Sequence, residues 1–128
     1  MREILFRGKR KLGNEWIESS LHTEKFADDE EYLCCEINQC DVYPETVGQY
    51  TGLTDKNGRK IFEGDIVIDK YSKEKFGFVG VVKYNENLTK FQIVSDKYPN
   101  YDVGVGSRRD SIKILGNAYD NPELLKGE

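Results

Sequence analysis

The sequence predicts a mainly β fold with little helix. Short runs rich in aromatic and β-branched residues alternate with turn signals, and such residues favour strands. Aromatic residues form 12% of the 128 residues, and 8 residues are Tyr. The sequence shows no internal repeat and no long amphipathic helix. A succession of short strands separated by turns is typical of a small β-barrel or sandwich.

The expected strands follow one another along the chain. They lie at residues 4–8, 15–18, 32–37, 47–51, 66–68, 76–84, 89–94 and 111–115. A turn at residues 11–14, Lys-Leu-Gly-Asn, joins the first two. Trp16 begins the second strand and is expected to anchor the core under this hairpin, because a Trp has a large apolar area to bury. An exposed Trp that stacks on a ligand is the alternative.

The central hairpin is the strongest local signal. Asp55-Lys56-Asn57-Gly58 joins an Asp, whose carboxylate accepts bonds from nearby backbone N–H groups, to a Gly that adopts the left-handed conformation. Apolar arms at residues 50–53 and 61–62 flank this turn. A second bend, at residues 63–65, leads into the next strand. We therefore expect a positive φ angle at Gly58.

Two short motifs in the C-terminal part of the chain predict the structure of their own residues. Residues 104–107, Gly-Val-Gly-Ser, lack the spacing and the following helix of a phosphate-binding loop, so we interpret them as an ordinary loop. Asn121-Pro122-Glu123 is typical of a helix start, with Asn as N-cap, Pro at the first helical position and an acid in the first turn. We expect a short helical turn there.

Composition restricts the classes of function. The chain has 19 Lys and Arg against 23 Asp and Glu, a net charge of −4. An acidic total argues against non-specific nucleic-acid binding, which needs a basic surface to displace counterions. No run approaches the roughly 18 apolar residues of a transmembrane helix, and the N-terminus lacks the apolar core of a signal peptide. We therefore expect a protein of the cytoplasm, with no membrane partner.

Three thiols raise the question of a metal site. Cys34, Cys35 and Cys40 offer, with His22, four conceivable zinc ligands. Their spacing fits no common zinc knuckle, which usually separates paired Cys by two to four residues. The odd number of Cys and the lack of an export signal argue against a disulfide framework. We therefore expect reduced thiols, no bound metal and no cofactor.

Three segments of the chain resemble the YopX family, a group of small proteins encoded by phages and prophages of bacteria. Residues 48–67 match its central signature, Gly-Gln-Tyr-Thr-Gly-Leu-Thr-Asp-Lys-Asn-Gly followed by Ile-Phe-Glu-Gly-Asp-Ile-Val. Residues 1–9 resemble the opening strand of the family, and residues 115–125 resemble its closing motif. The resemblance implies a β lobe at residues 1–50 and an SH3-like β-barrel at residues 51–128. It implies no enzymatic activity.

Two functions are open to such a chain. The first is a non-enzymatic binding or assembly module, because small β-barrels bind through loops and sheet edges, and paired edges also make homo-oligomers. Opposite charges at residues 2–11 and 24–31 offer a contact within one copy or between copies, and the alternative is two solvated surfaces that do not meet. An enzyme is not expected, because the chain has one His and no motif of catalytic spacing.

The alternative is a small β-barrel that binds single-stranded nucleic acid through mixed basic and aromatic side chains. The residues of this kind are Lys83, Tyr84, Lys90, Phe91, Tyr98, Tyr101, Arg108 and Arg109. The candidate partner-binding residues among them are Tyr98, Tyr101, Arg108 and Arg109. Because the net charge is negative, we expect a protein partner or self-association rather than nucleic-acid binding.

Overall fold

The computed structural model describes residues 3–25, 31–35, 41–69, 78–95, 103–105 and 111–125. These residues confirm a mainly β fold, because they form antiparallel strands with two short 3₁₀ segments, η2 (Pro44–Thr46) and η3 (Pro122–Leu125). No helix within these ranges is long and apolar enough to cross a membrane. The chain divides into two compact units, a first unit Met1–Tyr50 and a second unit Thr51–Glu128.

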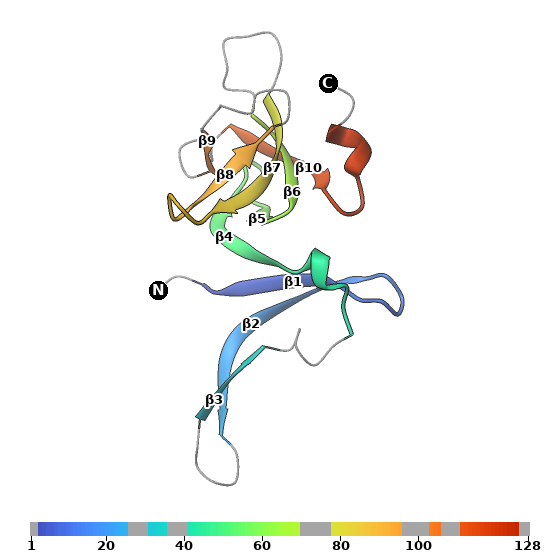
Figure 1. Cartoon of the computed structure of the whole chain (residues 1–128), viewed down its shortest axis with the longest axis vertical. Helices are drawn as coiled ribbons and strands as arrows, with labels where there is room; N and C mark the ends of the chain where they lie inside the picture. The colour runs from blue at the N-terminus through green and yellow to red at the C-terminus, as the bar shows by residue number, and fades with distance from the viewer. Residues whose placement is uncertain are drawn as a thin grey trace. The chain divides into compact units, whose positions relative to one another are not determined.

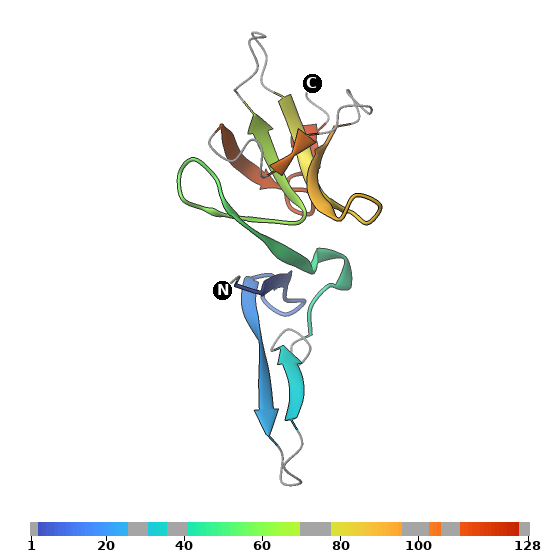
Figure 2. The ribbon, with the colours of Figure 1, turned by 90° about the vertical axis from the view of Figure 1, so that its left-hand side faces the viewer.

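The first unit is a sheet built around a hairpin. Its strands are β1 (Leu5–Lys9), β2 (Trp16–Lys25), β3 (Glu31–Cys35) and the first residues of β4 (Gly48–Thr54), in the order β3-β2-β1-β4 (Figure 1). β2 is antiparallel to β1 and to β3, and Figure 2 shows β2 and β3 side by side. The expected turn between β1 and β2 is confirmed, with φ angles of 91° at Gly13 and 56° at Asn14.

Trp16 is half-buried, so it is a core anchor only in part. Arg7 lies opposite Glu18 in the register of β1 and β2, which makes Arg7 and Trp16 diagonal neighbours on one face of the sheet. The guanidinium carbon of Arg7 lies 5.0 Å from the centroid of the Trp16 ring. A cation over a Trp ring is attracted by the ring quadrupole. The ring therefore contributes to the hairpin by holding a cation as well as by burying apolar area.

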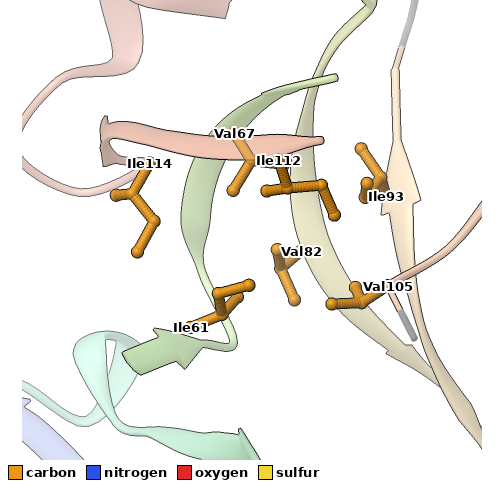
Figure 3. Packing of buried hydrophobic residues seen from close by; sticks show 7 residues of the cluster. All are labelled: Ile61, Val67, Val82, Ile93, Val105, Ile112 and Ile114. Carbon is orange, nitrogen blue, oxygen red and sulfur yellow. The ribbon is translucent and has the colours of Figure 1, made fainter. Parts of the chain in front are cut away.

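The second unit contains the main hydrophobic core. Its sheet has the order β10-β6-β7-β8-β9, with every neighbouring pair antiparallel. The strands are β6 (Asp65–Asp69), β7 (Phe78–Asn85), β8 (Lys90–Val94), β9 (Val103–Gly104) and β10 (Ile112–Asn117). β5 (Lys60–Phe62) neighbours the end of β4. Branched aliphatic side chains from five strands and from the residue after β9 meet in the core (Figure 3), namely Ile61, Val67, Val82, Ile93, Val105, Ile112 and Ile114.

The described strands of the second unit do not close into the expected SH3-like barrel. The sheet is open, since β10 and β9 end it and neither pairs with a further strand among the described residues. β5, which has three residues, pairs with β4 and is not a strand of this sheet. Instead, Ile61 of β5 lies against the core side chains of the sheet.

β9 corrects the interpretation of residues 104–107 as a loop at Gly104, while residues 106 and 107 lie outside the described residues. Val103 lies opposite Ile93 of β8, and Gly104 lies opposite Gln92. The next residue, Val105, is 1% exposed and belongs to the core. Gly104 is one of the two residues of β9, and the strand escaped prediction because Gly weakens the strand signal.

The predicted central turn is confirmed. Gly58 has a φ angle of 81°. The backbone N–H of Gly58 donates to the carbonyl of Asp55 at 3.0 Å, and the N–H of Asp55 donates to the carbonyl of Arg59 at 2.8 Å. A further bond joins the turn to β10, since the N–H of Lys56 donates to the carbonyl of Ile112 at 3.0 Å. Backbone bonds therefore hold the turn together and also attach it to β10.

Candidate partner-binding surface

The structure leaves the four candidate residues from the sequence untested. Tyr98, Tyr101, Arg108 and Arg109 lie outside the described residues. The other four basic and aromatic candidates are described, and all lie on the hairpin of β7 and β8. These are Lys83, Tyr84, Lys90 and Phe91. The predicted combination of basic and aromatic side chains is therefore present on this hairpin.

Two aromatic rings on this hairpin form a pair. Tyr84 and Phe91 lie opposite each other in the strand register. Their ring centroids are 5.1 Å apart, and the ring planes meet at 60°, an edge-to-face arrangement. Phe91 packs against the hydrophobic core, while Tyr84 is 44% exposed. Phe91 therefore braces an exposed ring from the core side, and such pairs prefer this geometry.

A shallow, open groove of about 360 Å³ lies on the same hairpin. It is lined by Lys83, Tyr84, Asn85, Glu86, Gln92 and Val94. The side-chain amide of Asn85 donates to Oε1 of Gln92 at 2.9 Å across the two strands. Oδ1 of Asn85 also accepts bonds from the backbone N–H groups of Asn87 at 3.0 Å and Leu88 at 3.1 Å. These bonds fix the polar wall of the groove before anything binds.

Both signs of charge occur along the groove. Lys83 and Glu86 are exposed residues of its lining. One cation and one carboxylate beside a Tyr and two amides form a mixed polar and aromatic surface. Tyr is enriched at protein–protein interfaces because one side chain offers apolar area and a polar tip. The lining is therefore suited to a polypeptide surface.

Asp55 is a buried carboxylate of the second unit, 5% exposed. Its Oδ1 atom accepts bonds from the N–H groups of Asn57 and Arg59, each at 2.9 Å, and its Oδ2 atom accepts one from Ile114 at 3.1 Å. Burial by itself raises the pKa of Asp55. The three N–H donors, with the nearby charge of Arg59, outweigh burial and hold the pKa below its ordinary value.

Two more buried carboxylates also serve the fold. Asp65 accepts a bond from the N–H of Phe62 at 2.8 Å, across the bend in which Gly64 has a φ angle of 93°. Asp69 accepts a bond from the hydroxyl of Ser111 at 2.7 Å, which joins β6 to the start of β10. The buried acids of this unit are thus engaged in bonds that hold turns and strands in place.

The cysteines and His22 fall partly within the described chain. The register of β2 and β3 places His22 opposite Cys34 and Leu21 opposite Cys35. Cys40 lies outside the described residues. Within the described ranges, no three or more His, Cys, Asp or Glu residues are grouped so that they could hold a metal ion.

The fold and the hairpin groove describe a small antiparallel β protein with an exposed aromatic ring on one hairpin. The chain belongs to the YopX family, since the family described as YopX protein matches residues 5–126. The comparison with curated proteins returned no match. The crystal structure of protein EF1440 from Enterococcus faecalis is similar to this chain, with a TM-score of 0.53 and 21% identity over 95% of this chain and 97% of that one. At this identity the likeness shows the fold alone.

Proposed function

We propose that this YopX-family chain is a non-enzymatic binding or assembly module, encoded by a phage or prophage and active in the cytoplasm of its bacterial host. The family resemblance supports the phage or prophage origin. The observation that carries the binding role is the braced and exposed ring of Tyr84 beside the groove on β7 and β8. The structural use of the buried carboxylates supports a role outside catalysis.

Tyr84 has the properties of an interface anchor. Residues that dominate binding energy are enriched in Tyr and sit where packing already holds them. Phe91 lies 5.1 Å away by ring centroids and packs on the core, so little rotamer freedom of Tyr84 remains to be lost on binding. Side chains that are ordered beforehand lose less entropy in a complex. A partner that covers Tyr84 and fills the groove gains the binding energy of a Tyr side chain. It also loses little entropy, because that side chain is already ordered.

The partner we propose first is a second copy of the chain. Most soluble oligomers are homo-oligomers, and two-fold dimers are the commonest form. In such a dimer the groove of one copy faces the same groove of the other, so Lys83 of one copy can meet Glu86 of the other. Opposite charges within one patch allow this self-complementary contact, whereas a patch of one sign would repel its copy.

Light scattering on the purified chain, over a range of concentrations, tests this proposal. We expect a mass above that of the monomer at high concentration. Tyr84→Leu should shift the equilibrium toward monomer by at least about tenfold in dissociation constant, the size of effect that a hot-spot side chain has. Tyr119→Leu is the matched control, because Tyr119 is an exposed ring of the same unit, at 40% exposure. It should leave the mass unchanged.

A monomeric mass at every concentration would defeat self-association. The broader binding role then depends on a host or phage protein that binds wild type and Tyr119→Leu but not Tyr84→Leu. Equal retention of that protein by both variants would remove Tyr84 and the groove from the proposal.

A further inference from the structure

A second surface of the same unit carries four exposed basic residues. We call it the basic cluster, and it consists of Lys56, Arg59, Lys60 and Lys113. The first three belong to the central turn and the start of β5, and the fourth lies on β10. They are separated by more than fifty residues of sequence, yet backbone bonds hold these two segments together. The lysines therefore project from a rigid corner of the fold.

Two hydrogen bonds build this corner. The N–H of Lys56 donates to the carbonyl of Ile112, the neighbour of Lys113, at 3.0 Å. The N–H of Ile114, the other neighbour of Lys113, donates to Oδ2 of Asp55 at 3.1 Å. Lys113 is therefore flanked on both sides by contacts to the turn that carries Lys56 and Arg59.

Asp55, an acid within this corner, is already engaged in hydrogen bonds. Asp55 is buried, and its carboxylate accepts three backbone N–H bonds and feels the charge of Arg59. In the first unit, Arg10 pairs with Glu15 and Lys11 pairs with Asp41. Lys56 and Lys113 have no such acidic partner in the described part of the chain. Their charge faces solvent.

The net charge of −4 is distributed unevenly between the two units. Acidic residues exceed basic ones within residues 1–50, whereas basic residues slightly exceed acidic ones within residues 51–128. Three acids of the second unit, Asp55, Asp65 and Asp69, are buried. The surface of this unit is therefore more basic than the net charge of the whole chain suggests. The expectation against nucleic-acid binding depended on that net charge.

We infer that the basic cluster docks the phosphate backbone of a single nucleic-acid strand, a role beyond the proposed self-association. Exposed Lys is depleted at protein–protein interfaces, while nucleic-acid interfaces are strongly basic. Gly58 lies between Lys56 and Arg59, and nothing lies within 4 Å of the position a Cβ would take there. A strand can therefore approach the turn closely. The contact is independent of base sequence and sensitive to salt, since phosphates carry no sequence information.

Fluorescence anisotropy with a labelled oligodeoxythymidine tests this inference. Binding should be seen at low salt and weaken as salt rises. A single strand loses about 0.7 in the slope of log K against log salt for each phosphate contact, so four contacts predict a slope of about −3. Lys113→Gln should make this slope shallower by about 0.7, and Lys56→Gln with Lys113→Gln by about twice that.

Lys113→Arg is the matched control, because it keeps the positive charge of the same exposed residue. It should leave the slope unchanged, and thermal unfolding should show that all variants remain folded. Three results would overturn the inference. They are no binding by wild type at low salt, equal effects of Lys113→Arg and Lys113→Gln, and displacement of the oligonucleotide by poly-glutamate at equal charge concentration, which would point to an acidic protein. Tyr84→Leu affects the proposed self-association and should not affect this binding, so the two proposals fail separately.

Discussion

The carboxylate of Asp55 accepts a hydrogen bond from the backbone N–H of Ile114, 59 residues further along the chain, at 3.1 Å. The same carboxylate caps two N–H groups of its own turn. One side chain therefore fixes the central hairpin and attaches it to β10. Because the group is buried and ionised, its loss should affect the whole second unit rather than the turn alone.

Asp55→Asn is expected to lower the free energy of unfolding by about 2 kcal/mol at neutral pH, the range for hydrogen bonds to a charged group. The Asn oxygen can still accept bonds from Asn57 and Arg59. Its NH₂ group would then face the N–H of Ile114, so that two donors meet. Urea unfolding followed by circular dichroism measures the change. Glu123→Gln, which removes one negative charge from an exposed residue, should leave stability nearly unchanged.

The same pair of proteins tests the pKa of Asp55. Its pKa in the folded chain lies below the value of about 3.9 expected when unfolded. Its contribution to stability is therefore complete above about pH 4 and is lost as pH falls through the lowered folded value. The stability difference between wild type and Asp55→Asn should be constant near neutral pH and shrink in acid. A difference that grows as pH falls would contradict the lowered pKa.

Gly58→Val should destabilise the chain by more than about 1 kcal/mol, because a β-branched residue is strained at a φ angle of 81°. No atom lies within 4 Å of the added Cβ, so the penalty reports backbone conformation and not a clash. Gly58→Asn is the control, since Asn tolerates the left-handed region. It should lose clearly less stability in the same thermal melts. If Gly58→Val melted like wild type, the turn assignment would be wrong.

Gly80→Ala should cost about 1–3 kcal/mol through steric overlap. A Cβ at this residue would lie 2.7 Å from the carbonyl oxygen of Val94 and 2.7 Å from Cγ2 of Ile93, where β8 passes close to β7. Gly8→Ala is the matched control in β1, because its Cβ would meet Val47 at 3.4 Å, an ordinary contact. Chemical unfolding of the two variants should show a loss for Gly80→Ala and little change for Gly8→Ala.

We expect the purified chain to contain no zinc. The reason is the spacing of Cys34, Cys35, Cys40 and His22, which fits no common ligand set. Elemental analysis of protein expressed in zinc-supplemented medium measures the metal content directly. One zinc per chain, with loss of structure on addition of a chelator, would contradict this prediction, because structural zinc contributes to folding free energy.

Local patterns were enough to predict the turns and most strands. Asp55 and Gly58 lie three residues apart and determine the central turn by their own conformational preferences, so no distant contact is needed to foresee it. The hairpin of β1 and β2 follows in the same way from the Gly13-Asn14 turn. β9 escaped prediction because its two residues gain strand character from pairing with β8, which is a property of neighbours in space.

The sequence by itself determined the mainly β class, the YopX resemblance, the central turn and the positive φ angle of Gly58. Each depends on residues close together in the chain, where backbone preference and side chain to backbone bonds act locally. Only the tertiary structure decided that the described sheet is open, that Tyr84 is exposed and braced by Phe91, and that Lys113 joins Lys56 at one corner. Burial and pairing between distant segments set these features, and no spacing within a single segment encodes them.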